Sequence, residues 1–198
     1  MAPTSSEFAV AAAGGAPRGG IHVLCVGNEL AHDDGVGILV GRILQELELG
    51  PQIQVRFLQH VGFDLVDVLR VAEQVIIVDA ARTGRRPGTC FRLDPADLDP
   101  QLGHVVSCHG IGLPELLGVA RRLDPQSANA RVTIVCIEVE DVRPYGFGLS
   151  ARVQQAMPEA LTMVLDLVGV SEATAGRATT LARLARSWVG SVGDAHVG

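Results

Sequence analysis

The chain lacks the features that mark nucleic-acid-binding and membrane-spanning proteins. Its 198 residues carry a formal net charge of −6, whereas a nucleic-acid surface shows as clustered basic residues. No apolar run approaches the roughly 20 residues needed to cross a bilayer. We therefore expect no nucleic-acid partner and no membrane segment.

Cysteine is scarce, and its placement bears on the redox environment. The chain has four cysteines, Cys25, Cys90, Cys108 and Cys136, and they form no C-x-x-C pair. Scattered cysteines of this kind are typical of reduced thiols in a cytoplasmic protein. The first 20 residues also lack the basic start and apolar core of a secretion signal. The sequence thus predicts a cytoplasmic protein.

The composition is that of a folded domain. Hydrophobic residues make up 47% of the chain and charged residues 19%, which suits one domain with a well-developed core. We expect a disordered leader in residues 1–20 and a single α/β domain in residues 21–170. Residues 171–198 form a tail that we expect to be partly helical, because residues 179–189 have weak helical periodicity. We expect a monomer.

Strand and helix patterns alternate along the predicted domain. Apolar or β-branched runs typical of strands occupy residues 21–26, 53–58, 75–78, 89–93 and 132–139. Apolar residues at helical spacing occupy residues 36–47, 65–72, 113–123 and 153–168. This alternation predicts a three-layer α/β/α sandwich around a mostly parallel sheet.

The run at residues 75–78 is apolar throughout, which predicts a central strand covered on both faces. The turn Arg85-Arg86-Pro87-Gly88 follows closely. We expect the next strand, residues 89–93, to return antiparallel as a hairpin partner. The predicted sheet is therefore mixed.

Residues 26–37 read V-G-N-E-L-A-H-D-D-G-V-G and carry the strongest functional signal. They join a predicted strand to a predicted helix, so Asp33 and Asp34 lie at the carboxyl end of a strand, where open α/β sheets place their ligands. One carboxylate could simply cap the helix. Capping needs one acid, which leaves the second to face a ligand.

Two further residues could complete a site. Asp79 ends the central strand in I-I-V-D-A-A, where it would either cap the following turn or meet a partner or metal, because a buried unpaired carboxylate costs several kcal/mol. His109 lies in V-V-S-C-H-G-I-G-L-P-E, before a predicted helix, and a structural role is its alternative. Two carboxylates and an imidazole suit a borderline divalent cation such as Ni²⁺ or Zn²⁺.

The remaining candidates are weaker. We expect surface or loop positions for His22, His32 and His60, with His60 the nearest to the site because it follows the second strand. Cys108 beside His109 suggests a thiol nucleophile, but adjacent residues on a turn usually point apart. Ser150 is expected to cap the last helix.

Four motifs in order resemble those of the hydrogenase maturation endopeptidases. They are V-G-N-E-L-x-x-D-D-G-V-G, I-I-V-D-A with a downstream P-G-T, S-x-H-G-I-G-L-P-E-L-L, and G-x-G-L-S at residues 146–150. The resemblance extends from about residue 21 to residue 168. It implies a mixed five-stranded sheet flanked by helices, with one antiparallel strand.

The resemblance also implies an activity. Members remove a C-terminal extension from the large-subunit precursor of a nickel-iron hydrogenase after its metal centre has been loaded. By motif, the catalytic and metal-contacting residues here are Asp34, Asp79 and His109. The implied enzyme is an aspartic-type, nickel-gated endopeptidase without a serine or cysteine nucleophile. Its nickel arrives with the substrate, and zinc or cadmium would take the same site in crystals.

The chain departs from the family pattern in two places. Residues 59–64 read Q-H-V-G-F-D where members often have a D-G-G-T-like turn, and Ala151 replaces a common proline. Two other functions stay open. A non-cleaving, nickel-sensing chaperone of the precursor could use the same fold. A peptidyl-tRNA hydrolase also begins with a strand and a G-N loop, but it needs a basic surface that this acidic chain lacks.

Overall fold

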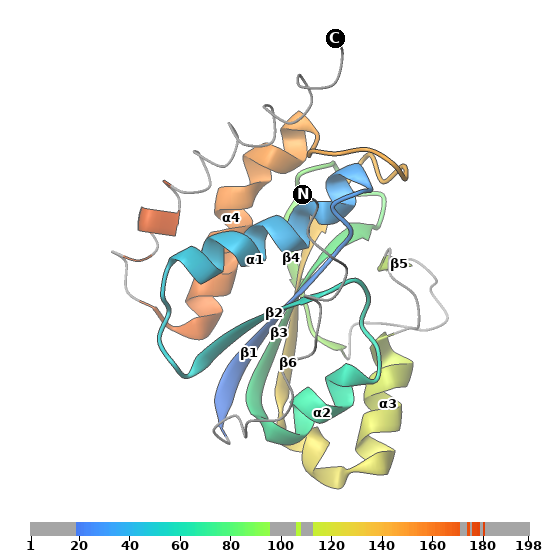
Figure 1. The fold of residues 1–198 in the computed structure, drawn as a ribbon. Helices are drawn as coiled ribbons and strands as arrows, with labels where there is room; N and C mark the ends of the chain where they lie inside the picture. Colours follow the sequence, from blue (N-terminus) through green and yellow to red (C-terminus); the bar gives the residue numbers. More distant parts are fainter. Residues whose placement is uncertain are drawn as a thin grey trace, which may run out of the picture.

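A computed structural model describes residues 19–95, 106–107, 113–170, 174, 176–178 and 180 of the chain. Its centre is a mixed sheet in the order β2-β1-β3-β6-β4 (Figure 1). Four strands run parallel, and β4 runs antiparallel to β6. A short strand, β5, pairs antiparallel with the end of β3. The strands are β1 (Gly20–Val26), β2 (Ile53–Leu58), β3 (Ala72–Arg82), β4 (Cys90–Leu93), β5 (Val106–Ser107) and β6 (Arg131–Glu138).

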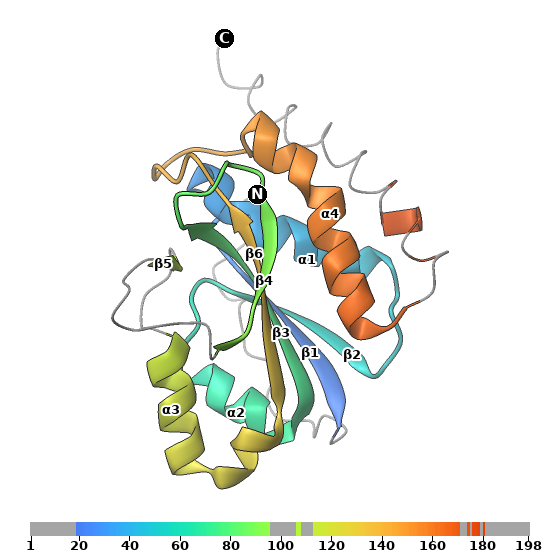
Figure 2. The same cartoon turned by 180° about the vertical axis from the view of Figure 1, so that it is seen from behind.

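Helices cover both faces of the sheet, as Figures 1 and 2 show from opposite sides. One face carries α1 and α4, and the other carries α2 and α3. The mixed, mostly parallel sheet and the three-layer α/β/α sandwich are thereby confirmed. The helical elements are η1 (His32–Gly35), α1 (Val36–Glu46), α2 (Asp64–Val71), α3 (Leu113–Leu123), η3 (Pro125–Asn129) and α4 (Ala151–Val168).

The middle strand, β3, explains why its sequence is apolar without alternation. Ile76 and Val78 point into the core under α1 and α4, whereas Val75 and Ile77 point into the core under α2 and α3. Both sets are buried because both faces are covered. The predicted central position is confirmed.

The predicted hairpin between β3 and β4 is wrong in its partner, although β4 is antiparallel as expected. β6 lies between the two strands and pairs with both. The connection crosses the end of β6 instead, where Gly88 N–H donates to the Glu138 carbonyl at 2.8 Å and Glu138 N–H donates to the Thr89 carbonyl at 2.9 Å. The short turn after β3 predicts that the chain reverses direction, but it does not exclude a third strand between β3 and β4.

Only a few residues at the two ends of the chain are described. Residues 1–18 of the predicted leader and most of the predicted tail lie outside the described residues. Ala178, in a short helical stretch of the tail, is 1% exposed and packs with the core under α1 and α4. Among the described residues, no helix is long and apolar enough to span a membrane.

His22 corrects a prediction, because it lies neither in a loop nor at the surface. It sits within β1, is 0% exposed, and neither of its ring nitrogens has a hydrogen-bond partner among the described residues. Burial, helped by the positive charge of Arg56, lowers the pKa of His22 from 6.5 to about 4. The folded protein therefore holds this imidazole neutral.

This burial predicts an acid-sensitive stability. Between pH 6.5 and pH 4 the unfolded chain protonates His22 and the folded chain does not, so the free energy of unfolding falls with pH by up to about 3 kcal/mol. His22→Leu should remove this slope and raise stability at pH 7 by about 1–2 kcal/mol, since it deletes two unpaired polar atoms. Urea unfolding across this pH range measures both effects. Parallel pH profiles for the two proteins would contradict the assignment.

Candidate functional site

The first turn of α1 packs closely on two strands. A side chain on Gly37 would collide with the carbonyl oxygens of Val26 and Val78, so this turn rests against the end of β1 and against β3 next to Asp79. Gly27 is held as closely, because a side chain there would meet the Asp34 carbonyl oxygen. The glycines of the motif thus bring η1 into contact with β3.

Asp33 is a structural anchor that links this loop to the one between β6 and α4. Its carboxylate is fully buried and accepts three backbone N–H groups, from Glu140 at 3.2 Å, Asp141 at 3.0 Å and Ser150 at 2.5 Å. Its own N–H donates to the Asp141 carbonyl at 2.9 Å. Such charge-assisted bonds are among the stronger ones in proteins.

The capping prediction is confirmed in position for Ser150 and wrong for the acids of the first loop. The N-cap of α1 is Gly35, which receives no side-chain hydrogen bond. Ser150 is the N-cap of α4, but its hydroxyl makes no capping bond and is buried without a hydrogen-bond partner among the described residues. Asp33 instead binds the backbone at the start of α4 from another part of the chain.

Asp34 and Asp79 are buried at the same edge of the sheet. Each is 4% exposed. Asp34 belongs to η1, which packs on β3, and Asp79 lies on β3 one residue beyond Val78. We call this the carboxyl edge, where β1, β2, β3 and β6 end. The charge of Asp79 is felt by its partner in register, Cys136, whose pKa burial and then Asp79 raise to about 12.

His109 lies outside the described residues, and its place in the site stays a prediction. The chain on either side is described. Ser107 pairs with Ala81, two residues beyond Asp79, and α3 begins at Leu113. Among the described residues, no group of three or more His, Cys, Asp or Glu side chains is arranged to hold a metal ion.

Glu138 is a buried acid at this edge that the sequence prediction missed. It is 2% exposed and accepts hydrogen bonds from Thr83 N–H at 2.8 Å, the Thr83 hydroxyl at 2.7 Å and Gly84 N–H at 2.8 Å. It thereby fixes the loop that follows Asp79. The signal was available, because V-T-I-V-C-I-E ends a strand with an acid as I-I-V-D does.

Of the weaker candidates, His32 and His60 lie outside the strands and α-helices, as expected. The His32 ring packs against Gly146, where any side chain would collide with it. His60 is exposed after β2. Cys25, Cys90 and Cys136 are free and buried, as predicted for reduced thiols, and burial raises the pKa of Cys90 to about 12. Cys108, the proposed alternative nucleophile, lies outside the described residues.

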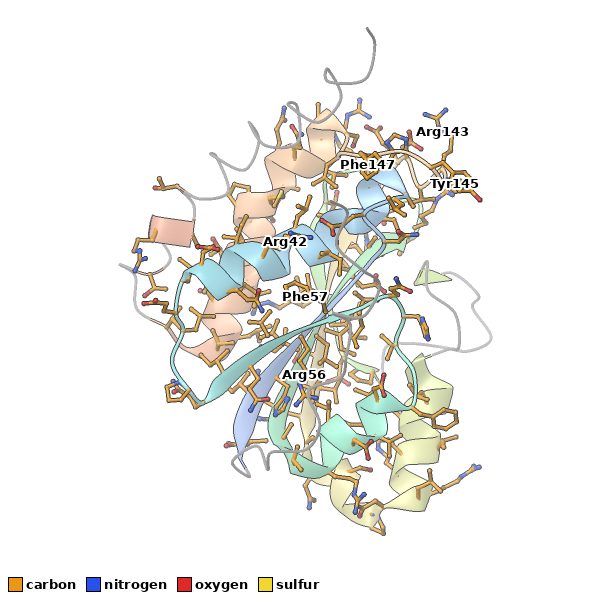
Figure 3. All side chains as sticks on the ribbon, in the orientation of Figure 1. Arg42, Arg56, Phe57, Arg143, Tyr145 and Phe147 are labelled. Atoms are coloured by element: carbon orange, nitrogen blue, oxygen red, sulfur yellow. The ribbon has the colours of Figure 1, made fainter. Side chains whose placement is uncertain are left out.

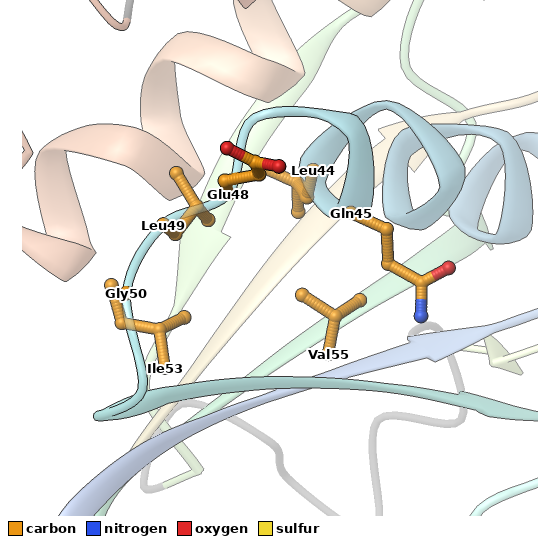
Figure 4. Close-up of a pocket in the computed structure, with 7 residues that line it drawn as sticks. All are labelled: Leu44, Gln45, Glu48, Leu49, Gly50, Ile53 and Val55. Atoms are coloured by element: carbon orange, nitrogen blue, oxygen red, sulfur yellow. The ribbon is translucent and has the colours of Figure 1, made fainter.

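An open hollow lies elsewhere on the molecule. Its volume is about 430 Å³, and it is bounded by the end of α1 and the start of β2, from Leu44 to Val55 (Figure 4). Ile53 begins β2, so the hollow is at the opposite end of that strand from the carboxyl edge. It does not include the buried acids.

Comparison with known proteins identifies the family. The profile of a family described as hydrogenase maturation protease matches residues 47–167. The chain belongs to this family. The matched residues include Asp79 and position 109 and begin after Asp34. The hydrogenase expression/formation protein HupD of Thiocapsa roseopersicina is 26% identical over 148 residues, which span 74% of this chain and 66% of that protein.

Solved structures of maturation proteases share the fold. The nickel-iron hydrogenase maturation protease HybD from Thermococcus kodakarensis is 25% identical, with a TM-score of 0.61 over 75% of this chain and 99% of that one. The hydrogenase maturating endopeptidase HybD from E. coli is 26% identical, with a TM-score of 0.60 over 75% of this chain and 91% of that one. This maturation protease thus has the sheet and helix arrangement of its relatives.

Proposed function

We propose that this protein is an endopeptidase that removes the C-terminal extension from the nickel-loaded large-subunit precursor of a nickel-iron hydrogenase. One observation carries the proposal: Asp34 and Asp79, from separate segments of a maturation protease, are both buried at the carboxyl edge of the sheet. Burying carboxylates in an apolar domain is costly unless hydrogen bonds or a cation compensate. This edge is where open α/β sheets bind their ligands.

The chemistry of these residues fits a nickel ion carried by the substrate. Asp34 and Asp79 would offer carboxylate oxygens and His109 an imidazole nitrogen, a set that suits a borderline divalent cation. When bound, the ion would either polarise the scissile carbonyl or activate a water molecule. The buried thiols Cys90 and Cys136 have raised pKa values, which disfavours the thiolate that a cysteine protease needs.

The chain's own contribution is to hold the two acids in place and exclude water around them. Asp33 fastens η1 to the loop before α4, and Glu138 fastens the loop after β3. Asp34 and Asp79 are therefore flanked by segments that are hydrogen-bonded on both sides of the site. A site preorganised in this way needs little rearrangement of its side chains when the precursor's metal binds.

The test is the mass of the product. Incubating the purified protein with nickel-loaded precursor from the same organism should release a C-terminal peptide, seen by mass spectrometry, whereas nickel-free precursor should stay intact. An unchanged mass for the loaded precursor would indicate binding without cleavage, as a chaperone would show, and would refute the proposal. Equal cleavage of both precursors would refute the nickel gate.

A further inference from the structure

Exposed aromatic rings are concentrated at the carboxyl edge. The sequence has only one tryptophan, one tyrosine and five phenylalanines. Among the described aromatic residues, Phe63, Tyr145 and Phe147 are 67%, 95% and 65% exposed, whereas Phe57, within β2, is 38% exposed. Phe63 follows β2, and Tyr145 and Phe147 follow β6, so the three most exposed rings lie in loops at the ends of parallel strands. A chain poor in aromatics thus presents them to solvent around its buried acids.

Tyr145 and Phe147 form an apolar patch with Leu30, which is 51% exposed. Gly146 N–H donates to the Leu30 carbonyl at 3.0 Å, and His32 N–H donates to the Gly146 carbonyl at 3.1 Å. The patch therefore joins the loop before η1 to the loop between β6 and α4. Figure 3 shows both labelled rings on the loop between β6 and α4.

The patch is held in a fixed position relative to the site. Asp33, next to Asp34, binds the backbone of Glu140 and Asp141 at one end of the loop and of Ser150 at the other. Tyr145 itself has a φ of 66°, a left-handed conformation that costs a non-glycine residue about 1 kcal/mol. The fold keeps this strain while leaving the ring in solvent.

The surroundings of the patch resemble an interface rim. Arg143 makes a two-pronged ion pair with Asp141, at 2.9 and 2.7 Å, and Arg152 bonds Glu140 at 3.2 Å. These charges compensate one another on the loop and at the start of α4. An apolar centre enriched in aromatic residues with a polar rim is the usual anatomy of a protein–protein contact.

We infer that Leu30, Tyr145 and Phe147 dock the precursor polypeptide beside its cleavage point. The inference rests on the proposed function, because it takes the substrate to be a protein. The patch includes Leu30, in the loop that leads to Asp34. The arginines around the patch are already paired with acids, so we expect the precursor surface that covers it to be apolar. A folded precursor whose extension enters the site would have to cover this patch.

The test compares substitutions at the patch with one outside it. Tyr145→Asn keeps a residue type that tolerates the left-handed backbone, and Phe147→Ser removes the second ring. Each should weaken precursor affinity about tenfold, with most of the effect in KM rather than kcat. Leu123→Ser is the matched control, because Leu123 is 67% exposed at the end of α3, away from the carboxyl edge. It should leave affinity unchanged.

Affinity is measured by fluorescence anisotropy of labelled, nickel-free precursor, which is expected to stay intact, so that binding is read without turnover. If cleavage fails in the wild type while the patch variants still lose affinity, the proposed function is wrong and the docking surface stands. Unchanged affinity in both patch variants would overturn the inference. It would also be overturned if light scattering showed that these variants dissociate a dimer without changing precursor affinity, since the patch would then join two copies.

Discussion

Asp34→Asn and Asp79→Asn are each expected to reduce cleavage of the loaded precursor by at least about 100-fold while leaving the protein folded. Each substitution preserves the shape of the side chain and removes its charge. Both positions are buried, and asparagine fills the same volume as aspartate, so neither substitution opens a cavity. We expect the free energy of unfolding to stay within about 1 kcal/mol of wild type or to rise, as happens when an active-site charge is removed.

The measurement combines initial cleavage rates with urea unfolding of the same preparations. Asp67→Asn is the matched control, because Asp67 is an acid on α2 whose side chain is 82% exposed, and it should retain full activity. His109→Ala should behave as the two acid variants do. If activity fell only in proportion to the fraction of unfolded protein, the two acids would be needed for folding and not for cleavage. Full activity in Asp79→Ala/His109→Ala would end the proposal of a shared metal site.

The burial of Asp34 and Asp79 at the carboxyl edge could be predicted because its evidence is local. Asp79 directly follows an apolar run, Asp34 lies in the loop after another, and parallel strands bring their carboxyl ends to one edge. The alternation of strands and helices likewise predicts the layers, since each element buries a face that its own periodicity shows. These features need no knowledge of distant residues.

What the sequence did not reveal depends on pairings far apart in the chain. Asp33 binds the backbone of Ser150, which lies 117 residues later in the chain. The local sequence could not show this partner, so a helix cap was the role it suggested. The insertion of β6 between β3 and β4 reflects a strand that comes almost 40 residues after β4. The burial of His22 depends on the helices that cover β1. Such contacts follow from tertiary packing, which local periodicity does not encode.

Asp33→Asn should be the most destabilising of these substitutions. Oδ1 of Asp33 accepts the Ser150 N–H, and Oδ2 accepts those of Glu140 and Asp141. An asparagine amide must turn N–H groups toward one of these donors, which leaves at least one buried N–H unsatisfied. We expect a loss of about 2–4 kcal/mol in the free energy of unfolding. Thermal unfolding should then begin about 5–15 °C lower.

Two substitutions at Ser150 separate this hydrogen bond from other effects. Ser150→Ala keeps the N–H and removes a hydroxyl that is buried without a hydrogen-bond partner in the described part of the chain, so stability should not fall. Ser150→Pro removes the N–H at a φ of −58°, which proline adopts without strain, and should cost about 1–2 kcal/mol. If alanine and proline at this position gave equal stability, the Asp33–Ser150 bond would not hold α4 against the first loop. The destabilisation of Asp33→Asn would then have to arise at Glu140 and Asp141 alone, because these are the other backbone groups that its carboxylate binds.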